Sequence, residues 1–129
     1  MNYSASMDLA DVLHGNAGND LILGGGGNDY LFGDRGDDIL NGGAGADTFV
    51  FTGGGGSDVV LDFESGSDML QIASDINGTG VASAEDVAAR ATTVGGNAVV
   101  DLGHGDTLTL VGVTAVDIQA DPNSYFTVA

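Results

Sequence analysis

The strongest constraint on the fold is a nine-residue period in the first half of the chain. Aspartate recurs at this interval without a gap, an apolar residue follows each aspartate by two positions, and glycine fills two further columns. A period of this kind is typical of repeat proteins, in which one copy is too small to fold alone and must stack on its neighbours. The aspartates are Asp11, Asp20, Asp29, Asp38 and Asp47, and the glycines are Gly15, Gly24, Gly33 and Gly42, then Gly18, Gly27, Gly36 and Gly45.

Each repeat divides into a six-residue turn rich in glycine and Asx residues and a three-residue apolar segment, which predicts a tight turn followed by a very short strand. The second turn position holds Asn16, Gly25, Asp34 and Gly43, residue types that tolerate left-handed backbone. This column therefore indicates a backbone requirement. Because alternate side chains of a strand face the same side, the large middle residue of each strand is expected to point inward. The core would then contain Leu13, Ile22, Leu31, Leu40 and Phe49.

The period weakens toward the middle of the chain. Phe51 and Thr52 are inserted before the copy that carries Asp58, and a one-residue shift precedes a degenerate copy with Asp68. At the other end Asp11 keeps the register without the glycines, as terminal repeats often do. We therefore expect a repeat domain at residues 11–72, a leader or degenerate N-terminal cap at residues 1–10, and a C-terminal cap at residues 73–129.

The charge of the repeats requires a counter-ion. The formal net charge is −17, from 19 acidic and 2 basic side chains, and most of the acidic residues lie between Asp11 and Asp68. Two like charges a few ångströms apart repel by about 1 kcal/mol in water and by several times that near a protein interior. Nucleic acid as a partner would need a basic surface, and no apolar run is long enough for a membrane span, so neither is expected. Ca²⁺ accepts roughly six to eight oxygen ligands in flexible geometry, whereas Mg²⁺ demands a near-ideal octahedron, which favours Ca²⁺.

Four gapless copies match the pattern G-G-x-G-x-D-x-U-x and resemble the nonapeptide repeats of the RTX calcium-binding family. The resemblance implies an all-β fold, a right-handed parallel β-roll in which successive repeats alternate between two facing sheets. It also implies about three to five Ca²⁺ ions, each held between turns two repeats apart by carboxylates and backbone carbonyls. The implied aspartate pairs are Asp20 with Asp38, Asp29 with Asp47, Asp38 with Asp58, Asp11 with Asp29, and Asp47 with Asp68. The implied turn residues are Gly15, Asn16, Ala17, Gly18, Gly24, Gly25, Gly26, Gly27, Gly33, Asp34, Gly36, Gly42, Gly43, Ala44 and Gly45.

The second half of the chain follows a different pattern. Ser83, three positions before Asp86, is typical of a helix N-terminus and predicts a short helix at residues 84–92. Two strands, at residues 98–102 and 107–111, are predicted to form a β-hairpin. A helix and a hairpin would cap the open end of a roll, and such caps keep repeat proteins soluble.

Residues 57–72 and 96–113 also resemble the segment that follows the repeats in serralysin-type metalloproteases and in the R-modules of mannuronan C5-epimerases. In those families the C-terminal region ends in an uncleaved signal for type I export. The apolar tail at residues 124–129 fits the position of such a signal, and it fits a last core strand equally well.

No catalytic site is expected in this chain. The zinc-protease motif H-E-x-x-H is absent, His14 and His104 are isolated, and a ladder of equivalent carboxylates lacks the split pKa values of a glycosidase. We therefore predict a non-catalytic calcium-binding module that folds on meeting extracellular Ca²⁺ and is secreted as the C-terminal part of a type I secreted bacterial protein. Its expected partners are the type I secretion machinery and an N-terminal partner domain, which an enzyme would supply. The alternative is a module that binds an alginate-like carbohydrate, a polyanion that would meet only Arg35 and Arg90 as permanent cations.

Overall fold

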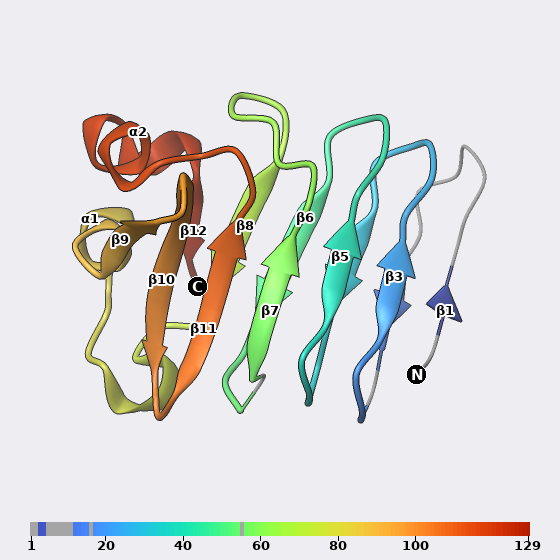
Figure 1. Ribbon diagram of the computed structural model, residues 1–129, viewed down its shortest axis with the longest axis horizontal. Helices are drawn as coiled ribbons and strands as arrows, with labels where there is room; N and C mark the ends of the chain where they lie inside the picture. The colour runs from blue at the N-terminus through green and yellow to red at the C-terminus, as the bar shows by residue number, and fades with distance from the viewer. Residues whose placement is uncertain (1–2, 5–11, 16, 55) are drawn as a thin grey trace.

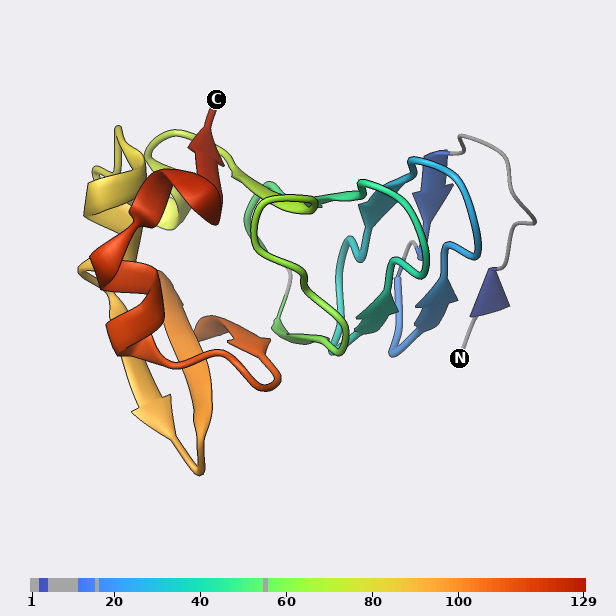
Figure 2. The same cartoon turned by 90° about the horizontal axis from the view of Figure 1, so that it is seen from above.

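The computed structural model describes residues 3–4, 12–15, 17–54 and 56–129 (Figure 1). Two facing β-sheets run along the molecule, and short helices gather at the end that carries the C-terminus (Figures 1 and 2). The strands are β1 (Tyr3–Ser4), β2 (Val12–His14), β3 (Leu21–Leu23), β4 (Tyr30–Phe32), β5 (Ile39–Asn41), β6 (Thr48–Phe51), β7 (Ser57–Val60), β8 (Met69–Ile72), β9 (Ala91–Val94), β10 (Asn97–Gly103), β11 (Asp106–Leu110) and β12 (Phe126–Val128). The helical elements are η1 (Ile76–Gly78), α1 (Ala84–Ala88), α2 (Ala115–Ala120) and η2 (Pro122–Ser124).

Successive repeats alternate between the two sheets. One sheet has the strand order β1-β3-β5-β7-β11-β10-β9 and the other has the order β12-β8-β6-β4-β2. From β1 to β8 every pairing is parallel and joins strands two repeats apart. Leu40 of β5, for example, is in register with Ile22 of β3 and with Val60 of β7. The predicted parallel β-roll is confirmed, and its handedness stays a prediction.

The core lies between the two sheets. The middle residues of β3, β4, β5 and the second residue of β6 are no more than 1% exposed, as the period predicts. Leu13 is only partly buried because β2 is the last strand of its sheet and pairs on one side alone within the described residues. The same hydrophobic cluster continues into the second half of the chain through Val87, Leu108 and Leu110.

Residues 73–129, the expected cap, continue both sheets of the roll and are called the cap below. The predicted hairpin is confirmed: β10 and β11 are antiparallel, and β11 lies parallel to β7 at the end of the repeats. The C-terminal strand β12 pairs in parallel with β8, and its Phe126 is 2% exposed. The apolar tail therefore contributes a last core strand, whatever further role it has.

The helices of the cap differ from the prediction. The Ser83 hydroxyl accepts the N–H of Asp86 at 3.2 Å, as expected, but α1 ends at Ala88 and not at Thr92. Thr92 lies in β9, which pairs with β10, because the β-branched residues that follow Ala91 favour a strand.

The sequence reading missed α2, although its N-terminus carries a readable signal. The Thr114 side chain accepts the N–H of Asp117, and the Asp117 carboxylate accepts the N–H of Thr114, which is a complete capping box. Neither α2 nor any other helix in the described residues has the length and apolar character needed to cross a membrane.

Candidate metal sites in the stacked turns

Aspartates two repeats apart are joined by hydrogen bonds. The backbone N–H of each donates to Oδ1 of the aspartate two repeats later, at 2.9 Å in every case, because alternation between sheets makes these turns neighbours. The bonded pairs are Asp20 with Asp38, Asp38 with Asp58, Asp29 with Asp47, and Asp47 with Asp68. We call these two series the aspartate ladders. The remaining predicted pair, Asp11 with Asp29, involves a residue outside the described part of the chain.

The carboxylates of the ladders are almost completely removed from water, since their residues are between 1% and 3% exposed. Burying a charged group is costly unless another charge or a set of hydrogen bonds compensates it. Within the described residues, Oδ2 of Asp38 and Oδ2 of Asp47 are buried and accept no hydrogen bond. A bound cation would supply the partner that each of these two oxygens lacks.

The first glycine of each repeat makes room for the carboxylate of the same repeat. A Cβ atom on Gly33 would lie 2.7 Å from Oδ2 of Asp38, and one on Gly24 would lie 2.7 Å from Oδ2 of Asp29. No side chain fits at that distance, so this column must be glycine. The carboxylate is thereby directed into its own turn.

The turns also approach one another closely. A Cβ on Gly36 would overlap the carbonyl oxygen of Gly18, and a Cβ on Gly43 would overlap that of Gly25. Gly43 has φ 77° and Asp34 has φ 64°, which confirms the left-handed backbone predicted for the second turn position. A Cβ on Gly24 would lie 2.6 Å from the Gly42 carbonyl oxygen and 2.7 Å from Oδ2 of Asp29, so the stacked turns bring a main-chain carbonyl group beside a buried carboxylate.

The donor set fits Ca²⁺. No three His, Asp or Glu side chains converge on one point in the described ranges, so side chains alone do not form a metal cage there. Two carboxylates from successive ladder positions, with carbonyl oxygens from both turns, supply the hard oxygen ligands that Ca²⁺ prefers. Of the turn residues named above, all but Asn16 lie in the described turns.

The Asp34 side chain has a different contact. Its Oδ2 lies 3.1 Å from Nδ1 of His14, whose ring stacks on Phe32 with the ring centres 4.3 Å apart. Asp34 therefore belongs to the turns through its backbone conformation, while its carboxylate contacts the His14 ring.

A second column of polar residues, which the sequence reading missed, holds the turns in register. Oδ1 of Asn19 accepts the N–H of Asp37 at 2.9 Å, and Oδ1 of Asp37 accepts the N–H of Ser57 at 2.9 Å. In the other stack of turns, Oδ1 of Asn28 accepts the N–H of Ala46 at 2.8 Å. The signal was the Asx residue directly before the ladder aspartate in three successive repeats.

Asp62 also supports the turns from outside the period. Its two carboxylate oxygens accept the N–H groups of Gly42 and Gly43, at 2.9 and 2.7 Å. Asp62 stands at the one-residue shift in the sequence, and its carboxylate contacts the turn that begins at Gly42.

Burial raises the pKa of four of the ladder carboxylates, those of Asp38, Asp47, Asp58 and Asp68. The pKa rises from 3.8 to about 6 for Asp38, to about 7 for Asp47 and to about 8 for Asp58, chiefly because burial penalises the charged form. The neighbouring ladder aspartates raise these pKa values further by charge repulsion, while backbone N–H groups oppose the rise. The pKa of Asp68 is raised for the same reason. These four carboxylates therefore resist ionisation when no calcium is bound.

The calcium-free chain is expected to be more stable in acid than at neutral pH. A carboxylate whose folded pKa exceeds its unfolded value contributes stability that is present below the unfolded pKa and lost as pH rises through the folded pKa. For Asp38, Asp47 and Asp58 this window runs from 3.8 up to folded values of about 6, 7 and 8. Circular dichroism of calcium-depleted protein should show strand signal growing as the buffer is acidified from about pH 8 to about pH 5. Asp58→Asn should weaken this dependence, and a signal that falls on acidification would contradict the argument.

Comparison with known proteins agrees with the turn geometry. A family model for the RTX calcium-binding nonapeptide repeat matches residues 7–40, 14–49, 24–60 and 36–70. The extracellular lipase LipA from Serratia marcescens is similar in structure, with a TM-score of 0.72 and 33% identity over 94% of this chain. The chain spans 20% of that lipase. The AlgE6R3 subunit of the Azotobacter vinelandii mannuronan C5-epimerase is 25% identical over 95% of this chain and 80% of the subunit, with a TM-score of 0.36. No curated protein matches the chain.

Proposed function

This chain belongs to the RTX calcium-binding nonapeptide repeat family through its residues 7–70, and we propose that Ca²⁺ bound in its aspartate ladders folds the module outside the cell. The observation that carries the proposal is the pair of buried oxygens, Oδ2 of Asp38 and Oδ2 of Asp47, which accept no hydrogen bond from the described residues. Each belongs to a carboxylate that lies against the first glycine of its own turn. A divalent cation would compensate both carboxylates of a ladder pair at once.

The ladders suggest the number of ions. One ion between each bonded pair of aspartates gives about four ions, within the range of about three to five expected from the sequence. Each central aspartate, such as Asp38, then contributes to two neighbouring sites. Binding is for that reason expected to be cooperative along the stack.

Folding would follow from binding. A ligand that binds only the native state stabilises it by about 2.7 kcal/mol per site at a hundredfold excess over the dissociation constant. The chain would thus remain unfolded where free Ca²⁺ is scarce, as in a bacterial cytosol, and fold after export. The similarity over 94% of the chain to a lipase described as extracellular supports this location.

The module would form the C-terminal part of a larger secreted protein. The chain matches one fifth of the lipase, which leaves room in such a parent for a catalytic domain before the repeats. We place the type I export signal in the tail at residues 124–129, part of which forms β12 in the folded state. The module itself would be non-catalytic, and its partners would be Ca²⁺, the export machinery and the preceding domain.

The alternative of an alginate-like carbohydrate ligand gains no specific support. Arg90, one of two permanent cations in the chain, already donates from Nε to the Asp101 carbonyl at 2.6 Å and lies 3.4 Å from its carboxylate. A polyanion would find few positive partners on this surface, so calcium binding remains the function proposed.

Asp38→Asn should weaken calcium binding without removing the hydrogen bond that holds the turns in register. The amide keeps an oxygen that can accept the N–H of Asp20, but it loses the charge shared by two sites. We expect the calcium midpoint to rise about tenfold or more, which corresponds to about 1.4 kcal/mol. Isothermal titration calorimetry would measure both affinity and the number of bound ions.

Asp121→Asn is the matched control. Asp121 is exposed, lies outside the repeats and accepts a hydrogen bond from the Ser124 hydroxyl at 2.6 Å, which an amide oxygen can also accept. If both variants shift the calcium midpoint equally, overall charge governs the response and the ladder sites are wrong.

A further inference from the structure

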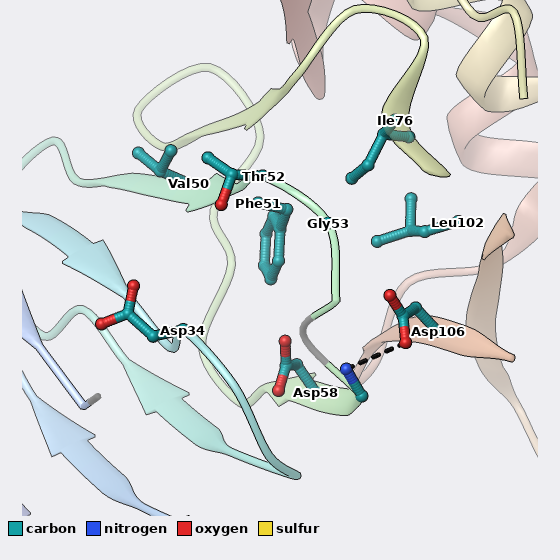
Figure 3. A pocket seen from close by; sticks show the side chains of 10 residues that line it. Asp34, Val50, Phe51, Thr52, Gly53, Asp58, Ile76, Leu102 and Asp106 are labelled. Carbon is teal, nitrogen blue, oxygen red and sulfur yellow. Dashed lines mark hydrogen bonds between the residues drawn. The ribbon is translucent and has the colours of Figure 1, made fainter. Parts of the chain in front are cut away.

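A cavity at the junction of the roll and the cap is not explained by the repeats. It measures about 20 Å³ and is lined by Asp34 of the turn after β4 and by residues of β6, of β7 and the turn before it, of η1 and of the hairpin (Figure 3). A volume of this size holds about one water-sized particle, so an organic ligand does not fit. Phe51, Ile76 and Leu102 form its apolar side, and Asp58 and Asp106 lie on the opposite side (Figure 3).

Asp58 differs from the other ladder aspartates. It is 3% exposed, and its Oδ1 accepts the N–H of Asp38, but its Oδ2 accepts no hydrogen bond from the described residues. In earlier repeats the first glycine of the turn lies against Oδ2 of its aspartate, whereas the atom nearest to a Cβ on Gly53 is Oδ1 of Asn77. The Asp58 carboxylate is therefore not covered by its own turn, and Asp58 lines the cavity together with Phe51 (Figure 3).

Asp106 brings a second carboxylate from outside the repeats. It is 9% exposed, Oδ1 accepts the N–H of Gly56 at 3.1 Å, and Oδ2 accepts the Asn77 amide at 2.9 Å. Asn77 in turn accepts the N–H of Gly54 through Oδ1 at 3.2 Å and donates to the Leu102 carbonyl at 2.9 Å. Two buried carboxylates thus line one small cavity, and none of the described lining residues is basic.

We propose that this cavity binds one divalent cation, Ca²⁺ by its donor chemistry, held between Asp58 of the last regular repeat and Asp106 of the cap. Thr52 lines the same cavity, and backbone carbonyls and water would complete the oxygen ligands. Because β11 occupies the sheet position that a further repeat would take beside β7, the ion would fasten the cap to the roll. This inference rests on the proposed calcium binding and adds a site that contains no second repeat turn.

The test counts bound ions in the full chain by equilibrium dialysis with calcium alone. Asp106→Asn should lose one ion per chain and lower the melting temperature in calcium, because the amide can still accept the N–H of Gly56 but carries no charge. Asp101→Asn, on the same hairpin and with 64% of its side chain exposed, should keep the original count. An unchanged count in Asp106→Asn would overturn the junction site. A chain that binds no calcium before any substitution would overturn the proposed function and this site together.

Asp106→Asn also removes a hydrogen bond, because the new amide would face the amide of Asn77, and this loss can by itself weaken folding. A second measurement therefore uses the unchanged chain. Anomalous scattering from crystals of the unchanged chain grown with Ca²⁺ would locate each ion directly. A peak between Asp58 and Asp106 would support the proposal, and peaks confined to the spaces between repeat turns would overturn it.

Discussion

Calcium-depleted protein is expected to lose most of its β-sheet signal at neutral pH and to regain it when millimolar Ca²⁺ is added. The six ladder aspartates are no more than 3% exposed, and the ion pairs formed within the described residues, His14 with Asp34 and Arg90 with Asp101, do not involve Asp38, Asp47, Asp58 or Asp68. About four sites that each contribute about 2.7 kcal/mol are comparable with the whole net stability of a small domain, about 5–15 kcal/mol. Loss of the ions should therefore unfold the roll.

Far-ultraviolet circular dichroism in EDTA, in Ca²⁺ and in Mg²⁺ would measure this response. Mg²⁺ should restore much less structure, because it gives up its water reluctantly and demands regular octahedral geometry. Sodium chloride at matched ionic strength is the control for general screening, which acts weakly on buried charges. A strand signal that survives chelation unchanged would show that the roll needs no ion.

The nine-residue period predicted the turns and the short strands because it acts locally, whereas the roll itself came from the family resemblance. Each copy fixes a left-handed turn position, a glycine that admits a carboxylate and one inward apolar side chain, and these are properties of residues close together in the chain. Gly33 and Asp38, five positions apart, already determine the shape of their turn. The pairing of Asp20 with Asp38 could not be predicted from the period alone, because it depends on the alternation of repeats between two sheets. The family resemblance supplied that alternation.

The junction between the roll and the cap could not be predicted from the sequence in the same way. Asp106 and Gly56 are bonded across 50 positions, and Asn77 reaches both the hairpin and the turn before β7. These contacts follow no period, because they depend on how the chain returns after the repeats end. The predicted end of α1 at Thr92 was wrong for a related reason. Thr92 lies in β9, which pairs with the distant strand β10.

A fragment that ends at Ile72 is expected to bind calcium weakly and to aggregate. The fragment lacks residues 73–129 and therefore lacks β11, which pairs with β7, and β12, which pairs with β8. In the fragment β7 and β8 become open edges of the two sheets. The partners lost include Leu110, in register with Val60, and Phe126, in register with Leu70. Open edges of this kind pair with other chains, and repeat arrays need caps to stay soluble.

The fragment keeps the ladder pairs from Asp20 to Asp68, so some calcium binding should remain. Calorimetry would measure the residual affinity, and light scattering would follow aggregation against the full chain at equal concentration. Phe126→Ala in the full chain is the matched control, because it removes a buried ring at a cost of about 3–5 kcal/mol but leaves the strand pairing in place. That variant should melt at a lower temperature and remain monomeric. A fragment that stays monomeric with the calcium affinity of the full chain would show that the repeats close their own edges, and residues 73–129 would then be an export or partner-binding element attached to a complete roll.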